Sequence, residues 1–169
     1  MQRRTVLKVG LAASVALAAA GSGLAWWMRS VPGPFRLSPE HREIFRAVGR
    51  AVLEGSLPPG ADVASRTLEA HLDRVEIAIA GFPPLVRAEA MQLLAVLANP
   101  IGRRMLGGLA TPWAEAGVEQ VQHALESMRF SRLALRQQAY HALRDFTNGA
   151  YYAEPGTWAL LDYPGPRDV

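Results

Sequence analysis

The chain of 169 residues contains no cysteine. This absence excludes disulfide bridges, thiol nucleophiles, iron–sulfur clusters, covalently attached c-type haem and cysteine-bound zinc. A fold without such links depends on its apolar core, and half of the residues are hydrophobic. After the first 28 residues about 140 remain, which is enough for one ordinary domain.

Lysine is almost absent from the chain. Outside the N-terminal segment there is also no excess of basic over acidic residues. The formal net charge of +3 comes from Arg3, Arg4 and Lys8, since residues 29–169 contain fifteen arginines and fifteen acidic residues. A nucleic-acid-binding protein needs a basic stripe that neutralises phosphates, whereas arginine and glutamate are interleaved along this chain. We therefore expect no nucleic-acid partner.

The usual motifs of catalytic and metal sites are also missing. No phosphate-binding loop and no H-E-x-x-H, Glu-x-x-His or G-x-S-x-G pattern is present. Glu119 and His123 are four residues apart and share a helix face, a spacing typical of a solvated pair and less often of metal ligands. We expect no catalytic residue, no metal site and no cofactor of its own; the alternative is a free-standing helical binding or metal protein.

The first 28 residues have the form of a twin-arginine export signal. Arg3 and Arg4 precede Leu7 and Lys8, and the uncharged run Val9–Met28 follows. This route carries proteins that are already folded. The pattern predicts a periplasmic protein addressed to the twin-arginine translocase.

Two interpretations of this leader follow from its sequence: it is removed by cleavage, or it is retained as a membrane anchor. Ala18–Ala20 offers a small-residue cleavage site, which favours removal. Alternatively, the run stays in the inner membrane as an anchor for a tethered scaffold, with Trp26 and Trp27 at the outer interface.

Helical periodicity begins after a Pro- and Gly-rich linker at 29–37 and persists over residues 38–148. Capping residues and prolines predict helix starts, while glycine and proline predict ends. Starts are expected at Ser38-Pro39, Asp62, Pro83-Pro84, Thr111-Pro112 and Ser131, and ends at Leu57–Gly60, Gly81, Asn99-Pro100 and Asn148-Gly149. The segment 101–110 predicts a turn with a single helical coil.

Each expected helix has one apolar face. The result is an all-α, compact bundle of about five helices. The faces are Ile44, Phe45, Val48 and Val52; Leu68, Leu72, Val75 and Ile79; Val86, Ala90, Leu93 and Leu97; Val118, Val121, Leu125 and Met128; and Leu135, Ala139, Leu143 and Phe146.

An aromatic, Pro- and Gly-rich tail occupies residues 149–169. Tyrosine and tryptophan bring large surfaces that favour burial and also dominate interface hot spots. The tail is therefore expected to pack either on its own bundle or on a partner. The partner-binding candidates are Tyr151, Tyr152, Pro155, Trp158, Tyr163 and Pro164.

This tail resembles that of the gluconate 2-dehydrogenase subunit 3 family, the small twin-arginine-bearing subunits of membrane-associated dehydrogenases. The leader and the Leu57–Gly60 segment are similar as well. One departure is that only Gly156-Thr157 separates Pro155 from Trp158, where family members often carry a longer Tyr-Gly-Gly-Asn segment. The matching residues are Gly149, Tyr151, Tyr152, Pro155, Trp158, Leu161, Tyr163, Pro164 and Gly165.

The resemblance implies a non-catalytic accessory subunit. In such systems the partner is a large FAD-dependent oxidoreductase of the glucose-methanol-choline (GMC) type, which has no export signal of its own. A membrane-bound cytochrome c subunit usually accepts the electrons. The small subunit would then bind the folded flavoprotein and carry the export signal for both.

Overall fold

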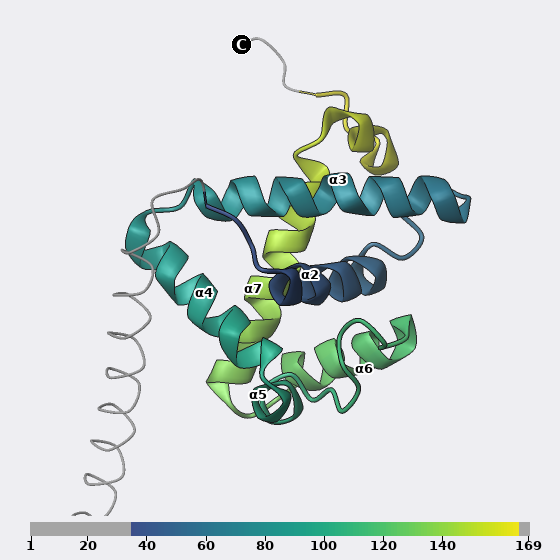
Figure 1. The fold of residues 1–169 in the computed structure, drawn as a ribbon. Helices are drawn as coiled ribbons and strands as arrows, with labels where there is room; N and C mark the ends of the chain where they lie inside the picture. The colour runs from purple at the N-terminus through teal and green to yellow at the C-terminus, as the bar shows by residue number, and fades with distance from the viewer. Residues whose placement is uncertain (1–34, 166–169) are drawn as a thin grey trace, which may run out of the picture. The chain divides into compact units, whose positions relative to one another are not determined.

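The computed structural model describes residues 35–165, which contain helices and no strand (Figure 1). This part of the chain forms six α-helices and one 3₁₀ helix. They are α2 (Pro39–Val52), α3 (Ala61–Ala80), α4 (Pro84–Ala98), α5 (Pro100–Met105), α6 (Val118–Arg129), α7 (Ala134–Tyr152) and η1 (Pro155–Leu161). The prediction of an all-α fold is confirmed, with α5 as the expected single coil. The leader, most of the linker and residues 166–169 lie outside the described residues.

Helix α2 is the centre of the packing, because it contacts α3, α4, α6 and α7. It begins as predicted: the Ser38 hydroxyl accepts a hydrogen bond from the amide of His41, and Pro39 occupies the first turn. Ile44, Phe45 and Val48 on its inner face are completely buried. Burial of each such side chain contributes about 1.5–3 kcal/mol.

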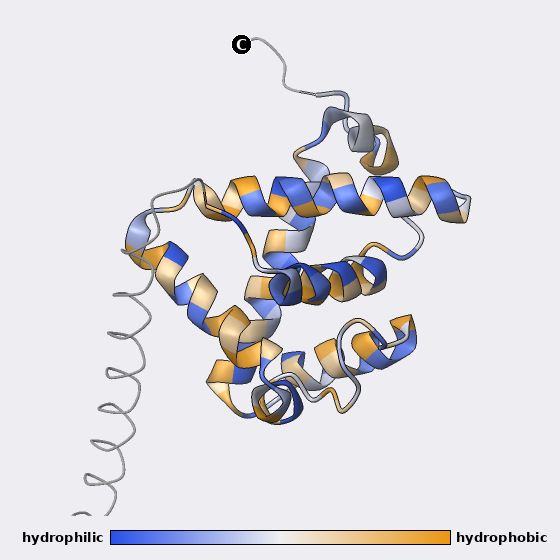
Figure 2. Ribbon diagram, in the orientation of Figure 1, coloured by the Kyte–Doolittle hydropathy of each residue, from blue (hydrophilic) through white to orange (hydrophobic). Residues whose placement is uncertain are grey.

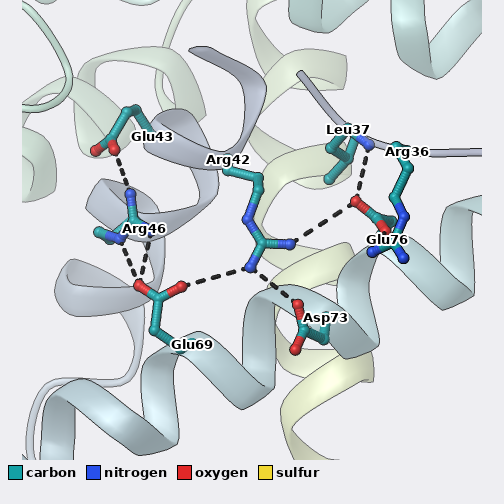
Figure 3. A network of polar contacts seen from close by, with 8 residues as sticks. All are labelled: Arg36, Leu37, Arg42, Glu43, Arg46, Glu69, Asp73 and Glu76. Carbon is teal, nitrogen blue, oxygen red and sulfur yellow. Dashed lines mark hydrogen bonds and ion pairs between the residues drawn. The ribbon is translucent and has the colours of Figure 1, made fainter. Parts of the chain in front are cut away.

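An ion-pair network joins α2 to α3 beside this apolar contact (Figure 3). Most of its pairs are partly exposed and contribute little to stability. Glu76 is different, since it is only 7% exposed and accepts a 2.8 Å hydrogen bond from the Leu37 amide. That contact fixes the segment preceding α2 onto α3. The network consists of Arg36, Leu37, Arg42, Glu43, Arg46, Glu69, Asp73 and Glu76.

Two predicted helix starts are wrong. Asp62 is not a cap, because α3 begins one residue earlier after Gly60, whose φ of +96° suits glycine. Thr111-Pro112 starts no helix, and α6 begins only after Gly117. Tertiary contacts hold the intervening loop in place: Trp113 is buried, and its indole N–H donates to the carbonyl of Leu97 at 2.8 Å.

The predicted stop at Asn148-Gly149 is also wrong, since α7 continues to Tyr152. Gly149 lies within the helix, and its φ is not positive. The residues after it complete the buried face of α7: Ala150 is 4% and Tyr151 2% exposed. Their burial outweighs the cost of about 1 kcal/mol for a glycine in a helix. A third predicted start is wrong at the other end of α7: the Ser131 hydroxyl accepts from the Leu133 amide, but Leu133 occupies the cap position and α7 begins at Ala134.

The predicted apolar faces are largely confirmed, with corrections on α4 and α7. Val86 and Leu135 are 42% and 62% exposed, whereas the unpredicted Leu94 is 2% exposed. Val86 and Leu135 line an apolar groove of about 510 Å³ between α4 and α7. Apolar residues consequently occur on the outer surfaces of these helices as well as in the core (Figure 2).

Candidate functional site

The aromatic residues of the C-terminal segment divide into a buried group and an exposed group. Tyr151, at the end of α7, belongs to the first. Its hydroxyl donates to the carbonyl of Ser56 at 2.6 Å, and its ring packs edge-on against His71 with centroids 6.0 Å apart. Burial raises the pKa of Tyr151. This side chain stabilises the domain and is not at the surface.

Tyr152 is half-buried and contacts the same loop. Its hydroxyl lies 3.3 Å from that of Ser56, and its ring packs edge-on against Tyr151. Tyr152 also lines a polar cleft of about 420 Å³ between α6 and α7, together with Tyr140, Arg129 and Arg144. One side of Tyr152 is thus used inside the domain, and the other faces the cleft.

Helix η1 is held against the end of α7 by side-chain hydrogen bonds to the backbone. The buried Thr157 hydroxyl lies 2.7 Å from the carbonyl oxygen of Glu154 and 3.3 Å from that of Tyr151, in the last turn of α7. The indole N–H of Trp158 donates to the carbonyl of Tyr152 at 2.9 Å, and its ring packs edge-on against Tyr163. A Cβ on Gly165 would lie 3.1 Å from that indole, so glycine lets the chain pass close to the ring. These contacts order the segment on its own domain.

The other face of η1 is apolar and open to solvent. Leu160 and Leu161 are each 55% exposed and Tyr163 is 47% exposed. We call these three residues the η1 rim. A short helix fixed by Thr157 and Trp158 therefore presents two leucines and a tyrosine at one end of the domain (Figure 1).

The sequence-predicted site residues are thus not equivalent. Among the partner-binding candidates, Tyr151 is buried, Tyr152 and Trp158 are half-buried, and Pro155, Tyr163 and Pro164 are exposed. The residues predicted to form the export signal lie outside the described residues; they are Arg3, Arg4, Leu7 and Lys8.

Sequence reasoning missed the residues that receive the tail. Ser56 supplies the backbone acceptor for Tyr151, and His71 supplies the packing surface. Neither carries a signal in the sequence, because both contacts join residues 80 or more positions apart. The only sequence evidence for Leu160 as a site residue is that it is apolar and precedes the motif residue Leu161.

The alternative metal pair lies on the exposed side of α6. Glu119 and His123 line a shallow pocket with Gln122 and Glu126. Within residues 35–165, no group of three or more histidine, cysteine, aspartate or glutamate side chains is arranged to hold a metal ion.

None of the helices within the described range is both long enough and apolar enough to cross a membrane. Comparisons with protein-family models, with curated proteins and with solved structures found no match to this chain. The family resemblance therefore rests on the residues of the N-terminal segment, of Leu57–Gly60 and of the tail.

Proposed function

We propose that this protein is a non-catalytic accessory subunit that binds a FAD-dependent oxidoreductase of the GMC type and escorts it through the twin-arginine pathway. One combination of features supports this proposal: the chain has a twin-arginine leader, and its tail presents an ordered apolar surface. The sequence of that tail resembles the subunit 3 family. The route transports folded proteins, and a flavoprotein has to fold around FAD before export. The leader then serves the partner as much as the subunit.

The η1 rim supports this role through its preorganisation. Exposed leucine and tyrosine side chains provide apolar area, and aromatic residues are enriched in interface hot spots. The bonds from Thr157 and Trp158 hold η1 before any partner arrives. Less conformational entropy is therefore lost on binding than for an unstructured tail.

The roles of the other parts follow from this arrangement. Arg3 and Arg4 address the translocase, and the domain itself carries no cofactor. FAD belongs to the large subunit, and a membrane-bound cytochrome c subunit is the expected electron acceptor. The site of action is the periplasm, with residues 9–28 either removed or retained as an anchor.

Co-purification tests the proposal directly. The tagged full-length chain, isolated from its own cells, is expected to bring down a large protein with the absorbance bands of oxidised flavin. The variant Leu160→Ser/Leu161→Ser is expected to lose that protein. The matched control Ile77→Ser/Leu85→Ser changes two apolar residues that are at least as exposed, on α3 and α4, and should retain it. Isolation of a colourless chain without a flavoprotein would refute the proposal.

Export provides an independent test. The Arg3→Lys/Arg4→Lys double variant is expected to leave both the subunit and the flavoprotein in the cytoplasm, because the partner has no signal of its own. Cell fractionation followed by a flavin assay measures this. A flavoprotein that still reaches the periplasm would show that the subunit is not its escort.

A further inference from the structure

Two segments of the domain contain arginine without any acidic residue. Residues 99–110 and 127–138 together hold five arginines and no aspartate or glutamate, although the chain beyond the leader is balanced overall. The structure brings these segments together. The Arg136 guanidinium donates to the carbonyl of Leu106 and to the hydroxyl of Ser127, both at 3.0 Å. The α5 helix and the α6–α7 turn therefore form one local surface.

This surface also exposes large apolar side chains. Ile101 and Met105 on α5 are 68% and 75% exposed, and Phe130 and Leu133 in the α6–α7 turn are 69% and 64% exposed. Figure 2 shows apolar residues in orange beside hydrophilic residues in blue on α5 and around this turn. They lie on a short helix and a turn, where side chains project outward. We call this region the basic-apolar face.

Its arginines have two distinct roles. Arg103 is buried and donates to the carbonyls of Leu109 and Ala110, so like Arg136 it holds the local fold. Arg104, Arg129 and Arg132 are exposed and have no ion-pair partner within residues 35–165. Arg42 and Arg46 of α2, in contrast, are paired with carboxylates of α3.

We propose that the basic-apolar face binds the surface of an anionic phospholipid bilayer. Unpaired arginines attract lipid phosphates, and each such residue near a charged membrane strengthens binding about fivefold. Exposed isoleucine, methionine, phenylalanine and leucine side chains can enter the boundary between headgroups and acyl chains without a shaped groove. Nucleic acid would use the arginines and leave the aliphatic groups in water, so a bilayer accounts for both features of the face.

The absence of cysteine permits a site-specific test in the full-length chain. The leader is itself basic and apolar, so vesicle binding alone does not identify the contact face. A single Met105→Cys substitution, labelled with an environment-sensitive nitrobenzoxadiazole fluorophore, reports insertion at α5. The matched probe is Ile77→Cys on α3, where the side chain is 70% exposed. Vesicles of phosphatidylglycerol mixed with phosphatidylcholine are expected to shift the emission to the blue only for the label at position 105.

Charge variants test the electrostatic part. The Arg104→Gln/Arg132→Gln pair is expected to raise the lipid concentration for half-maximal response of the position 105 label by at least about tenfold. The matched pair Arg66→Gln/Arg144→Gln removes the same charge from exposed positions on α3 and α7 and should change it little.

Three results would overturn the proposal. They are equal responses of the labels at 105 and 77, an equal response to pure phosphatidylcholine, and no response to phosphatidylglycerol. The last would make an acidic protein surface the better ligand for this face. These outcomes do not depend on whether a flavoprotein co-purifies.

Discussion

At the scale of single residues, His71 links pH to stability. It is completely buried, and neither ring nitrogen has a hydrogen-bond partner within the described range. Burial, with a smaller contribution from the charge of Arg74, lowers the pKa of His71 from 6.5 to about 4. The unfolded chain therefore binds a proton more readily than the folded chain between these two values.

The free energy of unfolding is consequently expected to fall as the pH drops through this window. The loss between about pH 7.5 and pH 5 should be about 2 kcal/mol. His71→Leu is expected to remove that component in urea unfolding measured at both pH values, and a smaller one should remain from His41, whose pKa is also lowered by burial. An unchanged pH dependence in His71→Leu would refute this assignment.

Glu76 illustrates how one buried carboxylate differs from its exposed neighbours. It accepts from the Leu37 amide at 2.8 Å and from Arg36 at 3.2 Å. Glu76→Ala leaves a buried N–H without an acceptor and is expected to lower the free energy of unfolding by about 2 kcal/mol. Glu76→Gln keeps an oxygen for Leu37 and should cost less.

The matched control in chemical denaturation is Asp73→Ala. The Asp73 side chain is 63% exposed and binds Arg42, so its loss should cost less than about 1 kcal/mol. Equal losses of stability for Asp73→Ala and Glu76→Ala would mean that the buried hydrogen bond from Leu37 to Glu76 contributes no more than an exposed ion pair.

At the scale of elements, the two glycines Gly149 and Gly102 should respond in opposite directions. Gly149 is helical, and an added Cβ would meet no atom of another element. Gly149→Ala is therefore expected to raise the free energy of unfolding by about 0.5–1 kcal/mol. At the sharp corner between α4 and α5, a Cβ on Gly102 would lie 2.0 Å from the Val96 carbonyl oxygen.

Gly102→Ala is accordingly expected to destabilise the domain by about 2 kcal/mol or more. Thermal unfolding of both variants compares the two positions. Destabilisation by Gly149→Ala would instead support a left-handed helix stop at that residue.

The end of α7 and the helix η1 should also differ in how strongly the loss of an aromatic side chain destabilises the domain. Trp158 lies outside the main hydrophobic core, and its contacts join η1 and the residues that follow it to the end of α7. Trp158→Ala is expected to preserve the α-helical circular dichroism while amide exchange accelerates at Thr157 and Tyr163, and the flavoprotein should be lost. Tyr151→Ala should cost about 3–5 kcal/mol, because a buried aromatic side chain is removed. Cooperative unfolding of the whole domain by Trp158→Ala would refute this division.

At the scale of the whole molecule, local sequence patterns predicted the fold class correctly. They failed at helix boundaries that depend on contacts between residues distant in the sequence. Ser38-Pro39 defines the start of α2 because its cap and proline act within four residues. The start of α6 and the end of α7 depend instead on Trp113 meeting Leu97 and on Tyr151 meeting Ser56, and no local pattern encodes those contacts.

The same limit applies to the candidate surfaces. The aromatic content of the tail was visible in the sequence, but its division into the buried Tyr151 and the exposed rim depends on the packing of α7. The basic-apolar face was hidden by the overall charge balance. It exists because Arg136 joins two segments about thirty residues apart.

The η1 rim and the basic-apolar face lie at opposite ends of the described domain in Figure 1. Substitutions in one surface should therefore abolish the binding of its own ligand and leave the binding at the other surface unchanged. Leu160→Ser/Leu161→Ser is expected to lose the flavoprotein and keep the vesicle response of the label at 105. Arg104→Gln/Arg132→Gln should weaken that response by at least about tenfold and keep the flavoprotein.

Combining the two assays on each variant, with circular dichroism as the check of folding, measures this independence. If either pair of substitutions abolishes both activities in a folded protein, the two ends are coupled and cannot be assigned separate ligands. If each loses only its own ligand, a flavoprotein and a bilayer can be held at the same time. The domain would then place the enzyme at a defined height above the membrane, close to an electron acceptor embedded in it.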